Sequence, residues 1–115
     1  MKRIQTDIQD YRTVVLWLDF YSQLLTDRTR EVLELHYNED MTVSEIAEHL
    51  AITRQGVHDK IRQGVSQLSD YEAKLGLVQR FLTQKEQIAQ VMADLDQGLA
   101  EKARTTLSRL YQSLG

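Results

Sequence analysis

The sequence predicts an all-α fold that contains a helix-turn-helix, a long following helix and a C-terminal helical tail. Three observations support this fold class. The 115 residues include no proline and only five glycines, so few residues in the chain interrupt a helix. Apolar residues recur at steps of three and four along the whole chain. Threonines precede several of these periodic segments, at the position of a helix N-cap.

The first two helices are predicted within residues 5–40. An apolar stripe predicts one helix over about residues 5–25. Thr26 can cap a second helix, which fades at residues 38–40 because Asn, Glu and Asp occur in succession there. The stripe of the first helix consists of Ile8, Tyr11, Val15, Leu18, Tyr21 and Leu25.

A helix-turn-helix is predicted next, because two capped helices follow one another with a short turn between them. Thr42 and Glu45 have the spacing of a capping box, and Thr53 can cap the second helix. Residues 51–52 form the turn. Ala47 is small, which permits close approach where the two helices cross. The predicted interface between them consists of Ile46, Leu50, Ile52, Val57 and Ile61.

The second helix of this motif is predicted to be long, because its apolar stripe continues beyond any segment that reads DNA. Within the stripe, residues at intervals of seven form a heptad-like seam. An apolar stripe that continues beyond its domain must be covered by a partner or by the tail folded back on it. The seam is therefore a candidate for homodimerisation. The candidate dimerisation residues are Leu68, Leu75 and Leu82.

Glycines and a second capping pattern divide the tail. Gly76 is expected to bend or end the long helix. Thr83 and Glu86 repeat the capping-box spacing, which predicts that another helix opens there and stops near Gly98. A last stripe begins at Leu99. The expected division is a helical unit at residues 1–69, with the helix-turn-helix at 42–69, and a tail at 70–115 for dimerisation or fold-back.

Polar residues at the start of the long helix are candidates for contact with nucleic acid. In a helix-turn-helix, the second helix presents its N-terminal outward face to the major groove. Arginine can read guanine there and glutamine can read adenine, while a threonine at the helix start can bind phosphate. The candidate residues are Thr53, Arg54, Gln55, His58 and Arg62. The net charge of −3 and the neighbouring Asp59 argue against indiscriminate DNA binding.

The segment "LTDRTREVLELHYNEDMTVSEIAEHLAITRQGVHDKI" is similar to region 4 of bacterial sigma factors. With "LDFYSQ" before it and "YEAKLGL" after it, the chain resembles the YlxM family over roughly residues 18–81. These are helix-turn-helix proteins of Gram-positive bacteria and mycoplasmas. Their genes lie beside those of the signal recognition particle GTPase and its receptor. The resemblance implies a regulatory or accessory role in that pathway, and it places the "TRQGVHDKI" residues in the recognition helix.

Other chemistry has little support in the sequence. There is no cysteine, nucleotide-binding glycine motif or nucleophile motif, so neither an enzyme nor a cofactor is expected. Glu45 and His49 share a helix face, but two ligands without a third predict no metal site. No apolar run is long enough for a membrane span, and residues 1–10 do not resemble a signal peptide. The cytoplasm is the expected location.

Three hypotheses remain open. The first is a DNA-binding regulator that uses the candidate residues above. The second is an accessory of the signal recognition particle that binds its RNA, its GTPase or the receptor. The third is a helical dimerisation module without either activity. Trp17, Phe20 and Tyr21 are expected to form core or dimer contacts, with base stacking as the alternative.

Overall fold

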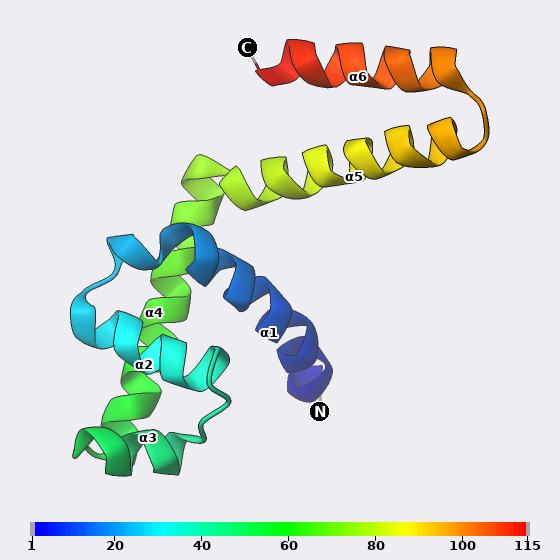
Figure 1. The fold of residues 1–115 in the computed structure, drawn as a ribbon. Helices are drawn as coiled ribbons and strands as arrows, with labels where there is room; N and C mark the ends of the chain where they lie inside the picture. Colours follow the sequence, from blue (N-terminus) through cyan, green and yellow to red (C-terminus); the bar gives the residue numbers. More distant parts are fainter. Residues whose placement is uncertain (1, 115) are drawn as a thin grey trace. The chain divides into compact units, whose positions relative to one another are not determined.

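The computed structural model describes the backbone of residues 2–114 and the side chains of residues 11–114 (Figure 1). The described residues form six α-helices, one short 3-10 helix and no strand, which confirms the predicted all-α class. The chain divides into two compact units, residues 1–76 and residues 77–115. This boundary lies seven residues beyond the expected one at Ser69. The predicted stripe residue Ile8 lies outside the described side chains.

The first unit begins with α1 (Lys2–Tyr21), the 3-10 helix (Ser22–Leu24) and α2 (Asp27–Tyr37). The predicted first helix was therefore too long at its C-terminal end. Leu25 has an extended backbone, and so does Thr26, because it serves as the N-cap of α2. The hydroxyl oxygen of Thr26 accepts a hydrogen bond from the backbone N–H of Thr29, as the capping pattern predicts.

The rest of this unit consists of α3 (Val43–Leu50) and α4 (Arg54–Leu75). Helices α1, α2 and α3 all pack against α4, so the long helix supplies one wall of the core to each of them. Figure 1 shows α2 and α3 beside the first half of α4. The large side chains that are less than 2% exposed all lie here: Val14, Leu18, Tyr21, Thr29, Val32, Leu33, Ile46, Val57 and Leu68.

Helices α2 and α4 cross at Gly64, which is buried. A Cβ atom added at Gly64 would lie 2.1 Å from Cδ1 of Leu33 and 2.9 Å from Cγ2 of Thr29. Real Cβ atoms do not approach other atoms so closely, so the two helices can pack at this distance only because residue 64 has no side chain. This contact fixes α4 against the centre of the unit.

The second unit is an antiparallel hairpin of α5 (Leu77–Asp96) and α6 (Ala100–Leu114), visible in Figure 1. Gly98 has φ of 76° in the connecting turn, which confirms the predicted helix stop. Gly76 has φ of 62° and is the C-cap of α4, so the long helix ends there. Val91 on α5 and Ala103 and Leu110 on α6 are buried.

The second capping pattern does not open a helix. Thr83 lies inside α5, which already begins at Leu77, directly after Gly76. No residue between Gly76 and Thr83 interrupts the helix, so the Thr83 hydroxyl has no free helix end to cap. It accepts a hydrogen bond from the side-chain amide of Gln79 instead, at 3.3 Å. The expectation of a helix start at Thr83 was therefore wrong.

Candidate nucleic-acid interface

The first helix of the helix-turn-helix begins with a complete capping box. The Thr42 hydroxyl oxygen accepts from the backbone N–H of Glu45 at 3.1 Å. In return, Oε1 of Glu45 accepts from the backbone N–H of Thr42 at 2.8 Å. Both N–H groups would otherwise lack a partner at the helix end. The Glu45 carboxylate therefore serves the cap, which removes the basis for pairing it with His49 as a metal ligand.

A tight turn joins α3 to α4. Ala51 takes a left-handed conformation with φ of 57°, and the backbone N–H of Ile52 donates to the carbonyl of Ala47 at 3.0 Å. Ala47 is buried at the crossing, as its small side chain predicts. It belongs to a core cluster with Val32, Ile46 and Val57. This packing fixes the start of α4 relative to α3, which is the condition for presenting a reading face.

All five predicted contact residues are exposed at the start of α4. Thr53 is its N-cap, and the Thr53 hydroxyl oxygen accepts from the backbone N–H of Gly56 at 2.9 Å. Arg54, His58 and Arg62 follow one another at steps of four, so they lie along one side of the helix. The structure thus brings the predicted residues together on a single face.

Asp59 engages two of these five residues. Its Oδ1 atom accepts from Nε2 of Gln55 at 3.0 Å and from the Arg62 guanidinium at 2.6 Å. The side chains of Arg62 and Asp59 are 74% and 56% exposed. An exposed pair of this kind contributes about 0–1 kcal/mol, so a phosphate or a base edge can replace the carboxylate. Sequence spacing placed Asp59 nearby but did not reveal that it binds both Gln55 and Arg62.

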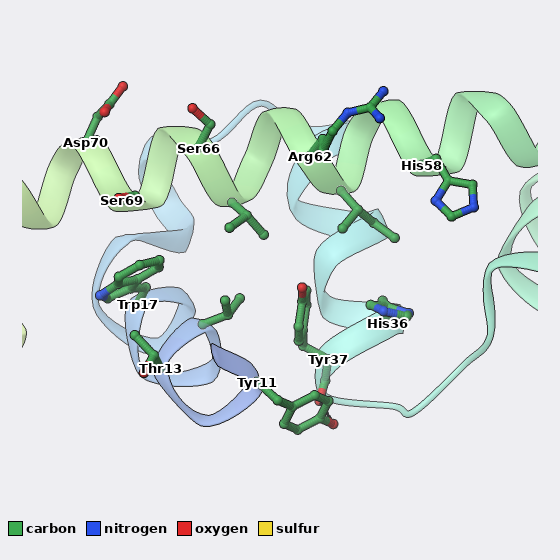
Figure 2. Close-up of a pocket in the computed structure, with 13 residues that line it drawn as sticks. Tyr11, Thr13, Trp17, His36, Tyr37, His58, Arg62, Ser66, Ser69 and Asp70 are labelled. Carbon is green, nitrogen blue, oxygen red and sulfur yellow. Dashed lines mark hydrogen bonds between the residues drawn. The ribbon is translucent and has the colours of Figure 1, made fainter. Parts of the chain in front are cut away.

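A groove of about 740 Å³ borders the same face (Figure 2). His58 and Arg62 line it from α4, Trp17 lines it from α1, and His36 and Tyr37 line it from α2. Figure 2 shows the Trp17 and Tyr37 rings in the space between α1 and α4. Trp17 is half-buried there. No pattern in the sequence indicates this groove, because it arises where three helices meet.

Hydrogen bonds hold one side of the groove in place. His36 donates through Nδ1 to the backbone carbonyl of Met41 at 2.9 Å, since a carbonyl oxygen can only accept. The rings of His36 and Tyr37 meet edge to face at 4.9 Å. The Tyr11 hydroxyl contacts the backbone carbonyl of Tyr37 and lies 2.6 Å from Oδ1 of Asp40, and this raises the Tyr11 pKa. The hydrogen bond to Asp40 is the main cause.

The three candidate dimerisation residues do not form one exposed seam. Leu68 is fully buried in the core of the first unit, so its side chain is not accessible to a partner. Leu75 is exposed at the end of α4, whereas Leu82 lies on α5 in the second unit. The expected seam required a single continuous helix, and Gly76 ends that helix.

Two features are absent from the part of the chain that the structure describes. In that part of the chain, no three His, Asp or Glu side chains are grouped as a metal site would require. None of the helices described there has the length and apolar character that crossing a membrane demands.

Comparison with known sequences gives consistent matches. Residues 9–110 match the profile of the UPF0122 family, described as "Putative helix-turn-helix protein, YlxM / p13 like". A UPF0122 protein of Acetivibrio thermocellus is 51% identical over 80 residues, which cover 70% of this chain and 68% of the relative. A relative from Fusobacterium nucleatum, also named UPF0122 protein, is 33% identical over 107 residues, which cover 93% of this chain and 97% of that protein.

Proposed function

The chain belongs to the UPF0122 family of helix-turn-helix proteins, and we propose that it is a regulatory protein that binds duplex DNA through the start of α4. One observation carries the proposal: Thr53, Arg54, Gln55, His58 and Arg62 are exposed together on a helix that is capped and fixed by its partner α3. This is the arrangement with which such motifs enter the major groove.

The net charge of the first unit favours specific recognition by a few side chains over non-specific binding to DNA. Residues 1–76 contain 9 basic and 13 acidic residues, a net charge of −4. A unit of this charge has a small phosphate footprint, so its non-specific affinity is low. Recognition then depends on a few side chains. DNA has to displace the Asp59 carboxylate from Arg62 and Gln55 before these two residues can bind base edges or phosphate.

The test is fluorescence anisotropy with a pool of random-sequence duplexes, followed by selection of the tightest binders. Replacing Arg54 and Arg62 with Ala is expected to reduce affinity at least tenfold without loss of helicity. The matched control replaces Arg12 and Arg28 with Ala, which removes the same charge from exposed positions on α1 and α2. Asp59→Asn should increase affinity, since it frees the Arg62 guanidinium from an ion pair. Equal binding by all these variants would refute the assignment.

Structured RNA is a second candidate, and the groove beside α4 is the observation that favours it. Unpaired RNA bases stack on aromatic rings and on arginine, and Trp17, Tyr37 and Arg62 line this groove. The same titration with signal recognition particle RNA tests this candidate, which also follows from the gene neighbourhood of the family. Trp17→Leu should weaken RNA binding and leave duplex binding unchanged. Binding to neither nucleic acid would favour a protein partner, with the particle's GTPase tested first.

A further inference from the structure

The hairpin of α5 and α6 leaves much of its apolar surface uncovered. Val91 on α5 and Ala103 and Leu110 on α6 are buried, and the two helices pack against each other. A second set of apolar residues remains open to solvent, with exposed fractions from 47% at Ile88 to 77% at Tyr111. This exposed set consists of Ile88, Met92, Leu95, Leu107, Tyr111 and Leu114.

These six residues lie on one side of the hairpin. On α5, Ile88, Met92 and Leu95 are spaced by four and three, so they form a stripe about 90° around the helix from the buried contact line. On α6, Leu107, Tyr111 and Leu114 repeat this spacing and this angle. Because the two helices are antiparallel, equal rotations from their shared contact line turn both stripes toward the same side. We call this surface the hairpin face.

The size of the hairpin face is that of a protein interface. At these exposed fractions, its six residues present on the order of 700 Å² of mostly apolar surface. A standard interface takes about 800 Å² from each partner, and the largest apolar patch of a typical monomer is about 300–600 Å². Burying such a face against another protein is favourable, because it removes apolar area from water.

We propose that the hairpin face binds the hairpin face of a second copy of this chain, so that two hairpins form a four-helix bundle. An interface with two-fold symmetry brings a surface against itself, so a charged face would repel its own copy. Here the six residues of the two stripes carry no acidic or basic group, and the nearest charges along the stripes are Lys85 and Arg104, three residues before each stripe begins. Residues 77–115 contain five basic and four acidic residues, a net charge of +1, whereas residues 1–76 are at −4.

The partner that binds the hairpin face is therefore a second copy of this chain. A two-helix hairpin with one apolar face becomes a complete bundle core when it is doubled, and the resulting packing is that of known four-helix bundles. This inference does not depend on nucleic-acid binding. Where both hold, the dimer carries two helix-turn-helix units, which suits recognition of paired half-sites.

The test is sedimentation equilibrium of the full chain over a range of concentrations. The wild type is expected at twice the monomer mass of 13.4 kDa. Met92→Lys combined with Tyr111→Lys should sediment as a monomer, with a dissociation constant raised at least 100-fold and an unchanged helical circular dichroism spectrum. Met92 and Tyr111 are 62% and 77% exposed, so the hairpin itself tolerates the change.

The matched control is Ala93→Lys combined with Gln112→Lys, which adds the same two charges on exposed positions away from the hairpin face. This variant should remain a dimer. A wild type that stays monomeric at all concentrations would overturn the proposal, because the face would then be covered within one chain or by a different protein. Dimers that persist in the Met92/Tyr111 variant would overturn it as well.

Discussion

The two units of this protein use similar helices in different ways. In the first unit, three helices surround α4, and every large side chain less than 2% exposed among the described residues belongs to it. In the second unit, two helices share a single contact line, and Ile88, Met92 and Leu95 stay exposed beside it. Helices with similar apolar stripes thus form a closed core in one unit and leave an exposed apolar face in the other.

This difference shows that the number of helices around a stripe decides whether it is buried. An amphipathic helix carries an apolar stripe at least about 100° wide, and one neighbour covers only part of it. Helix α4 has neighbours on several sides, so both Val57 and Leu68 are fully buried. Helix α5 has the single neighbour α6 within its unit. The rest of its apolar stripe is therefore exposed, and the exposed polar face at the start of α4 is its counterpart in the first unit.

The largest expected loss of stability follows from a substitution at Gly64, where α2 and α4 cross. Gly64→Ala should lower the free energy of unfolding by about 3 kcal/mol, because the new methyl group would lie 2.1 Å from Cδ1 of Leu33, a fully buried side chain that must shift within a closed core. Urea unfolding followed by Trp17 fluorescence measures this, since the chain has a single tryptophan and it lies in the first unit.

The control for this change is Gly56→Ala on the same helix. There a Cβ atom meets only the Thr53 hydroxyl oxygen, at 3.1 Å, so a change of less than about 1 kcal/mol is expected. If the two alanines cost the same, the close approach of α2 and α4 would not be what requires glycine at residue 64.

The second prediction compares the same substitution in the two units. Leu68→Ala should cost about 2–5 kcal/mol in the unfolding transition reported by Trp17, because it opens a cavity in a closed core. Leu95→Ala, at a position that is 55% exposed, should move that transition by less than about 0.5 kcal/mol. A large shift for Leu95→Ala would show that the stability of the first unit depends on the hairpin.

The sequence predicted those features of the fold that arise from local interactions. Thr26, Thr42 and Thr53 cap the helices that they were expected to cap, and Gly76 and Gly98 lie where helices end. Each of these signals depends on residues within a few positions along the chain. The helix-turn-helix follows from them, because its turn and its caps are local as well.

Features that depend on distant contacts could not be predicted in this way. The spacing that grouped Leu68 with Leu82 cannot show that Gly76 separates their helices or that α2 and α4 enclose Leu68. Nor does any pattern show that Trp17 and Tyr37 line a groove together with Arg62. These placements follow from how α1 and α2 pack on α4, and the apolar periodicity of each helix is compatible with several packings.

The third prediction uses the two Thr-x-x-Glu segments, one in each unit. Thr42→Ala should cost about 1 kcal/mol, because it leaves the backbone N–H of Glu45 without its acceptor at the start of α3. Thr83→Ala should change stability by less than about 0.5 kcal/mol, since Thr83 lies within α5 and caps nothing. Thermal unfolding followed by circular dichroism compares them. An equal loss at Thr83 would contradict its placement inside a continuous helix.

The smallest expected effect is a pH dependence that the Tyr11 hydroxyl gives to the first unit. Its hydrogen bond to Asp40 raises the pKa of Tyr11 above the usual value of about 10. The unfolded chain therefore loses this proton first as the pH rises. The stability that the hydroxyl contributes is complete below about pH 10 and is lost as the pH rises through the pKa of the folded state.

Tyr11→Phe should cost roughly 0.5–1 kcal/mol at neutral pH, which is the usual contribution of one such hydrogen bond. It should also remove part of the loss of stability above pH 10, because phenylalanine has no proton to lose. Urea unfolding followed by Trp17 fluorescence at neutral and alkaline pH measures both effects, with the exposed Tyr111→Phe as the control. If both variants lose stability in parallel with the wild type at alkaline pH, Tyr11 does not link α1 to Asp40. The closure of the first unit would then depend on apolar packing against α4 and on its other hydrogen bonds, such as that from Tyr21 to Glu72.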